Sequence, residues 1–237
     1  MLRLTVTKFD SRLTLDNTKD IKVVEVFNSA CLLSVNGRYK ALLAENRSGL
    51  PESMNVKQNN FGNIEAILRN GPLDFDFTCA SMWDSEVLPV SPRSISISSN
   101  ILDSFIRENC TRRSIFIDDL ILCGNLAGMI GCGPGLTPAG DDFVIGALNA
   151  SSFFSLDLFS SIKSVIAGIV SRTTALSNHF LELALTKRAA EDVKHLLFAI
   201  SRQKRQAISE YAEMLLNFGN TSGLYMLKGI AWVLKRI

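Results

Sequence analysis

The sequence predicts an α+β fold in which a β-rich N-terminal region, barrel-like or sandwich-like, packs on a mostly α-helical C-terminal region. Two observations predict this class. Polar and apolar residues alternate in stretches such as TVTKFDSRLTLD, which begins at Thr5 and is typical of strands. From about Ser98, apolar residues instead recur every three and four positions, which is the helical period. We therefore expect two domains, residues 1–95 and residues 96–237.

The β-rich region contains a clear hairpin signal. Asn36-Gly37 lies between the apolar stretches Leu32–Val35 and Arg38–Leu43, and this dipeptide readily adopts the positive φ angles of a two-residue turn. Proline and glycine then recur between short apolar pieces, which suits strand connections and a linker near Pro89–Ser94. We expect the β-rich region to end there.

The C-terminal region divides into helical segments. The first two, ILDSFIRENC and DDLILCGNLAGMIG, are separated by a break around Cys110–Arg113. Further segments are predicted at Phe143–Leu156, at Ser160–Lys187 as one or two helices, and at Ala189–Phe218, before a short apolar helix closes the chain. The run Phe143–Leu156 is free of charge but shorter than the about 20 residues of a membrane span, so it is predicted to be a buried helix.

Composition argues against several classes of protein. The chain has 25 Lys and Arg against 23 Asp and Glu, and a net charge of +2 does not favour nucleic acid as a partner. Its five cysteines show no CxxC spacing and it has two histidines, which argues against a zinc site or a disulfide framework. The N-terminal MLRLTVTKFD lacks the continuous apolar stretch of a signal peptide. We expect a cytoplasmic protein with reduced thiols and no membrane association.

The densest motif is GCGPGLTPAGDD, which begins at Gly131. Thr137-Pro138 is predicted to start a helix at Pro138, with the threonine as N-cap. Gly131, Gly133 and Gly135 allow positive φ and close approach, so several N–H groups are expected to converge on a phosphate or carboxylate at the positive end of the helix dipole. The pattern is neither GxxxxGK[ST] nor GxGxxG. A capped, buried helix without a ligand is the structural alternative.

Two adjacent aspartates, Asp141 and Asp142, fall in the first turn of this helix, where the helix dipole stabilises an acidic side chain by about 0.3–1 kcal/mol. Because the next residues are apolar on every face, the carboxylates are expected to be covered and to need partners. The candidate partners are Mg²⁺, a substrate amide or ammonium group, and an arginine such as Arg172. We predict both aspartates as catalytic residues. No cofactor is assigned, and Mg²⁺ is the candidate metal.

A second turn, GNTSG, begins at Gly219 and likewise places glycines and hydroxyl side chains just before a helix. Its hydroxyls can cap the final helix or bind an anion, and the stretch SRTTALSNHF supplies further polar residues between the two turns. We hypothesise that both turns converge on one ligand, although N-capping alone also explains the second turn. The predicted anion-binding residues are Gly133, Gly135, Leu136, Thr137, Gly140, Arg172, Thr174, Asn220, Thr221 and Ser222.

These motifs resemble the DUF2877 family. Three motifs occur in the family's order within residues 120–237: GPGLTPAGDDFVIGAL, TTALSNHFLELA and GNTSGLYMLKGIAWVL. The family's first motif typically reads GLTPSGDDFL and its last commonly reads GHTSG. The first motif is matched by Gly135, Thr137, Pro138, Gly140, Asp141 and Asp142. The last motif is matched by Thr221, Ser222 and Gly223. This sequence has Ala139 where serine is usual and Asn220 where histidine is usual. The second difference removes a side chain that could carry a proton.

The resemblance implies a function in carbamoyl transfer. Some family members, once labelled carboxylases, are a subunit of the oxamate carbamoyltransferase of anaerobic allantoin breakdown, which converts carbamoyl-oxamate and phosphate to oxamate and carbamoyl phosphate. The implied partners are an acyl-CoA-synthetase-like subunit and a small anion such as oxamate, phosphate or carbamoyl phosphate. The competing hypothesis is a non-catalytic assembly or regulatory subunit, which the scarcity of histidines and the lack of a nucleophile–base pair favour.

Overall fold

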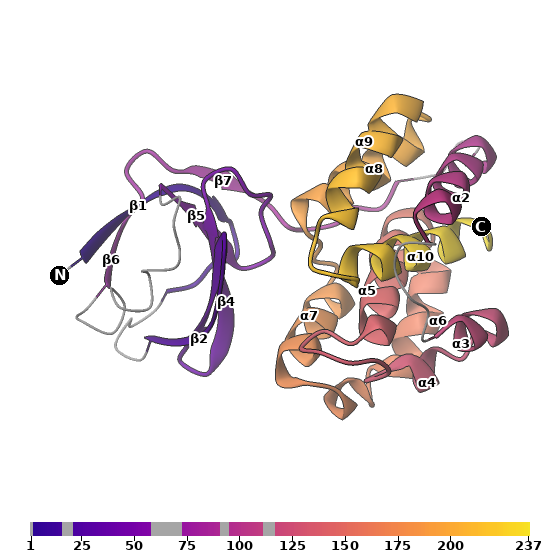
Figure 1. Ribbon diagram of the computed structural model, residues 1–237, viewed down its shortest axis with the longest axis horizontal. Coiled ribbons are helices and arrows are strands. Elements are labelled where there is room, and N and C mark those ends of the chain that lie inside the picture. Colours follow the sequence, from indigo (N-terminus) through magenta and orange to yellow (C-terminus); the bar gives the residue numbers. More distant parts are fainter. Residues whose placement is uncertain (1, 16–20, 58–72, 91–94, 111–116) are drawn as a thin grey trace. The chain divides into compact units, whose positions relative to one another are not determined.

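The structure is a computed structural model that describes residues 2–15, 21–57, 73–90, 95–110 and 117–237. By its contacts the chain divides into two compact units, Met1–Ser85 and Glu86–Ile237 (Figure 1). The first unit contains a sheet and the second is helical, so the predicted α+β class is confirmed. The domain boundary at residue 95 stays a prediction. Residues 91–94 of the expected linker and 111–113 of the expected helix break lie outside the described residues.

The first unit is built around strand β1 (Leu2–Asp10). Within the described residues the sheet has the order β2-β3-β4-β5-β1-β6, and β7 also pairs with β1. The β2–β3, β3–β4 and β1–β5 pairs are antiparallel, whereas β4–β5, β1–β6 and β1–β7 are parallel. The other strands are β2 (Ile21–Phe27), β3 (Ala30–Val35), β4 (Arg38–Ala44), β5 (Ser53–Val56), β6 (Leu73–Asp76) and β7 (Ser81–Trp83).

The predicted hairpin joins β3 and β4. Val35 pairs with Arg38 across the turn, and the two residues between them, Asn36 and Gly37, have φ angles of 52° and 77°. Positive φ at both positions is the type I′ geometry that matches the twist of the flanking strands. The hairpin prediction is confirmed.

The second unit is helical. Its helices in the described residues are α2 (Ser96–Cys110), α3 (Asp118–Cys123), α4 (Leu126–Met129), α5 (Ala139–Phe154), α6 (Leu156–Ile166), the 3-10 helix η1 (Val170–Arg172), α7 (Ala175–Leu185), α8 (Glu191–Ser201), α9 (Arg205–Leu216) and α10 (Ser222–Leu234). Every residue of α5 is buried, so the predicted buried helix is confirmed. No described helix has the length and apolar character needed to cross a bilayer.

Several helix boundaries differ from those that the apolar spacing predicts. The segment DDLILCGNLAGMIG is two short helices, α3 and α4, because Gly124 between them adopts a left-handed conformation with a φ of 67°. The run that starts at Phe143 ends at Phe154, because Ser155 adopts an extended conformation and its hydroxyl accepts from Leu158 N at the start of α6. The single segment expected over Ala189–Phe218 is two helices, α8 and α9. Gln203 lies between them with a φ of 54°, a left-handed conformation that ends a helix.

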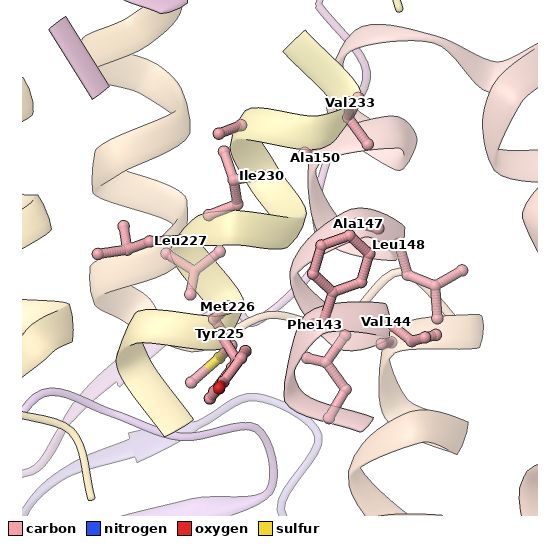
Figure 2. Packing of buried hydrophobic residues seen from close by; sticks show 14 of the residues in the cluster. Phe143, Val144, Ala147, Leu148, Ala150, Tyr225, Met226, Leu227, Ile230 and Val233 are labelled. Atoms are coloured by element: carbon pink, nitrogen blue, oxygen red, sulfur yellow. The ribbon is translucent and has the colours of Figure 1, made fainter. Parts of the chain in front are cut away.

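Helices α5 and α10 form the centre of the second unit (Figure 1). Figure 2 shows Phe143 and Ala147 of α5 beside Met226 and Ile230 of α10. Their backbones approach so closely that a Cβ atom on Gly229 would lie 2.0 Å from the carbonyl oxygen of Phe143. Glycine is therefore required for the close packing of α10 against α5 at this contact.

Candidate functional site

The turn between α4 and α5 has the glycine geometry that the sequence predicts. Gly131, Gly133 and Gly135 have φ angles of 77°, 120° and 95°, values that a residue with a Cβ rarely adopts. Gly140 serves a different purpose. A Cβ on this residue would lie 2.0 Å from Met129 O, and its own N–H donates to Cys132 O at 2.9 Å. This N–H group is thus committed to the fold, and the predicted anion-binding role of Gly140 stays a prediction.

The predicted N-cap is wrong. Helix α5 begins at Ala139, Pro138 occupies the N-cap position, and no side chain caps the helix. Thr137 lies one residue too early to cap. Its hydroxyl is instead 3.0 Å from the hydroxyl of Ser222, the first residue of α10. This contact joins the two turns, so they lie together as expected.

Asp141 is completely buried and its partners lie within the protein. Its Oδ1 accepts from Gly131 N at 2.8 Å, and its Oδ2 accepts from the Ser177 hydroxyl at 2.7 Å and from the Thr173 hydroxyl. Arg172, the expected arginine partner, is exposed. The carboxylate therefore fastens the turn to the start of α7 through two residues, Thr173 and Ser177, that sequence reasoning did not link to it.

Asp142 has a different environment. The residue is 3% exposed, and its Oδ2 has no hydrogen-bond partner among the described residues. Burial raises the pKa of the Asp142 carboxyl well above its usual value, and the neighbouring Asp141 charge raises it further, while a hydrogen bond with the Ser222 hydroxyl acts in the opposite direction. A buried oxygen without a partner is costly to the fold, so Asp142 is the carboxyl group of the motif whose hydrogen bonds the protein leaves incomplete.

The start of α7 completes the site. The Thr174 hydroxyl donates to Leu136 O at 2.5 Å and accepts from Ser177 N at 3.1 Å, so Thr174 is the N-cap of α7 and also holds the tip of the turn. The first residues of α5, α7 and α10 are therefore linked around one turn. Because each helix start carries partial positive charge, this arrangement favours an anion.

Five backbone N–H groups of the turn make no hydrogen bond to another described residue. They belong to Gly133, Gly135, Leu136, Thr137 and Ala139. Leu136 is 49% exposed at the surface of the turn. In the second turn, the expected capping of α10 by the Thr221 side chain is absent. Asn220 is exposed, and Thr221 occupies the N-cap position of α10 but its side chain makes no capping hydrogen bond.

The oxygen atoms do not fit a metal site. Asp141 already accepts from three donors, which leaves the unpartnered Oδ2 of Asp142 as the free carboxylate oxygen, whereas Mg²⁺ needs six oxygen ligands in octahedral geometry. In the part of the chain that the structure describes, no three His, Cys, Asp or Glu residues form a metal-binding group.

A groove of about 450 Å³ lies between α2 and α9, away from both turns. It is lined by residues such as Phe105 and Arg205, and none of its lining residues belongs to either turn.

The molecule is an α+β protein whose helical unit joins three helix starts around a glycine-rich turn and a buried carboxyl pair. Residues 129–234 match the family model described as oxamate carbamoyltransferase subunit AllH. The resemblance predicted from the motifs is thereby confirmed for this part of the chain, which contains both turns. No curated protein and no solved structure matches the chain.

Proposed function

We propose that the chain is a cytoplasmic subunit of a carbamoyl- or acyl-transfer enzyme of the oxamate carbamoyltransferase kind. Its ligand would be a small carboxylate, phosphate or carbamoyl phosphate, bound at the turn that precedes α5, and its partner an acyl-CoA-synthetase-like subunit. The unpartnered Oδ2 of Asp142 is the observation that carries this proposal, because a buried carboxyl oxygen at a helix start is supported best by a ligand that completes its hydrogen bonds.

The turn and the two aspartates take separate roles in this proposal. The unpartnered N–H groups from Gly133 to Ala139 hold the anionic part of the ligand. Asp142 orients the amide or carbonyl group to be transferred. Asp141 keeps the turn in place and touches no ligand. Positioned donors of this kind act by electrostatic stabilisation, and one well-placed donor is worth about 3 kcal/mol in a transition state.

The first experiment measures thermal unfolding of the full chain with phosphate, oxamate or carbamoyl phosphate. We expect at least one of them to raise the melting temperature, because a ligand that binds the folded chain stabilises it. Asp142→Ala should then abolish transfer in the assembled complex while leaving the chain folded, because it removes the carboxyl group that orients the ligand. Asp157→Ala is the matched control, since Asp157 lies exposed in the first turn of α6.

The alternative function is a non-catalytic assembly or regulatory subunit. It is supported by the commitment of Asp141 and of the Gly140 N–H to contacts within the protein. Unchanged turnover of the complex with Asp142→Ala, or no thermal shift with any of the three anions, would favour this alternative.

A further inference from the structure

An anion at this turn would lie beside two adjacent carboxyl groups. Asp141 accepts three hydrogen bonds and donates none, which is the pattern of an ionised carboxylate. If Asp142 were also ionised, both charges would repel the ligand in a buried region where water screens little. The helix starts favour an anion, so the second aspartate is the group that must change for the site to accept one.

Asp142 has the surroundings of a group that can hold a proton. It is 3% exposed, its Oδ2 lacks a partner, and its carboxyl interacts with the neutral hydroxyl of Ser222. No lysine or arginine forms an ion pair with it among the described residues. A neutral carboxylic acid offers one O–H donor as well as a carbonyl acceptor, whereas a carboxylate can only accept.

Charged groups on neighbouring elements do not compensate Asp142. The titratable side chains on the turn and on the elements that pack around α5 are Cys132, Asp157, Lys163, Arg172, His179, Glu182, Glu191, Asp192, Lys194, His195, Tyr225 and Lys228. The charge that acts on the Asp142 pKa comes instead from Asp141, and it has the same sign. Lys228, the cation nearest to the start of α10 on that helix, pairs with Asp118 at 2.8 Å.

We propose that this site binds its anion together with one proton. Asp142 is a neutral acid in the complex and donates a hydrogen bond from Oδ2 to an oxygen of the ligand, while the N–H groups of the turn hold the negative charge. Asp142 is thus a specificity-determining residue. The site selects ligands that place an acceptor oxygen next to the anionic group and discriminates against ligands with an ammonium group there. This inference rests on the proposed function.

Oxamate is the suitable probe, because it carries a carboxylate beside an amide oxygen and does not itself titrate near neutral pH. Its binding to the full chain is measured by titration calorimetry from pH 5.5 to 8.5, in two buffers of different ionisation enthalpy. Above the pKa of Asp142 in the ligand-free protein, we expect uptake of one proton per oxamate and an affinity that falls about tenfold per pH unit.

Two variants identify the group that takes up the proton. Asp142→Asn keeps the shape of a neutral acid, so its oxamate affinity should not vary with pH and no proton should be taken up. Ser222→Ala removes the hydrogen bond that lowers the Asp142 pKa, so the fall in affinity should begin at a higher pH. Asp157→Asn should behave as the unaltered chain does.

The results separate the two proposals. Oxamate binding with the same affinity at every pH and without proton uptake in the unaltered chain would overturn the proton-coupled mode and leave the proposed function standing. Proton uptake that persists in Asp142→Asn would assign the proton to another group and would also overturn it. If none of the anions binds the unaltered chain at any pH, the proposed function itself fails.

Discussion

Replacing Asp141 by alanine should destabilise the helical unit more than a change at any exposed acidic residue. The carboxylate is completely buried and accepts from Gly131 N, from the Ser177 hydroxyl and from the Thr173 hydroxyl. Alanine leaves these three donors without their acceptor. It therefore releases the turn and the start of α7 from α5 at the same time.

The magnitude follows from those contacts. Hydrogen bonds to a charged group contribute about 1.5–3 kcal/mol each, so the gross loss is on the order of 5–9 kcal/mol. The folded protein also no longer has to bury a charge, which returns part of this loss. We expect a net decrease of about 3–5 kcal/mol in the free energy of unfolding. Asp141→Asn keeps one acceptor oxygen and should cost less, about 1–3 kcal/mol.

Urea unfolding followed by circular dichroism at 222 nm measures this decrease, since the signal comes mainly from the helical unit. Asp157→Ala is the control, because it also removes an aspartate from the first turn of a helix but at an exposed position, where we expect a change within about 0.5 kcal/mol. Hydrogen exchange at the Gly131 amide adds a local readout and should become faster. Equal effects of the changes at Asp141 and Asp157 would refute the reasoning.

Two further predictions concern α10 and the pH dependence of stability. Gly229→Ala should lower the free energy of unfolding by about 1–3 kcal/mol, because the new Cβ would lie 2.0 Å from Phe143 O; this loss exceeds the gain of about 1 kcal/mol from the higher helix propensity of alanine. Gly168→Ala is the control and should be near neutral, since a Cβ there meets nothing within 4 Å. Equal effects of the two changes in denaturant unfolding would contradict the close packing of α10 against α5. The Asp142 pKa is higher in the folded protein than in the unfolded chain, so above about pH 4 the folded protein binds more protons than the unfolded chain does. The free energy of unfolding therefore falls as the pH rises from about 4 toward the raised pKa of Asp142. Asp142→Asn should therefore gain in stability over the unaltered chain as the pH rises from 4 to 8, and parallel stability profiles would show that Asp142 does not titrate in this range.

Local signals predicted the local structure correctly. Asn36-Gly37 determines its own turn, since few dipeptides tolerate two positive φ angles in succession. The glycines of the turn before α5 likewise identify positions of positive φ, and the apolar run after Asp142 identifies a buried helix. In each case the physical cause lies within a few residues of the signal.

The partners of the site residues could not be predicted in this way. The Thr137 hydroxyl meets a residue 85 positions along the chain, and Asp141 meets Ser177 36 positions along it. A threonine before a proline at a helix start is equally compatible with capping and with a tertiary hydrogen bond. Only the packing of α7 and α10 against α5 decides between them, and this packing depends on contacts distant in sequence.

The same packing explains how two identical neighbouring residues acquire different chemistry. Successive residues of an α-helix point about 100° apart, so Asp141 and Asp142 point in different directions. Asp141 is directed to the turn and α7, which together supply three donors, whereas Asp142 interacts with Ser222 at the start of α10 and retains an unpartnered oxygen. Gly229 lets α10 lie directly on the backbone of α5, since a Cβ at this position would lie 2.0 Å from Phe143 O. The surroundings of Asp142 therefore depend on the packing of α10 against α5 as well as on the acidic motif itself, and a larger residue in place of Gly229 should weaken the interaction between Ser222 and Asp142.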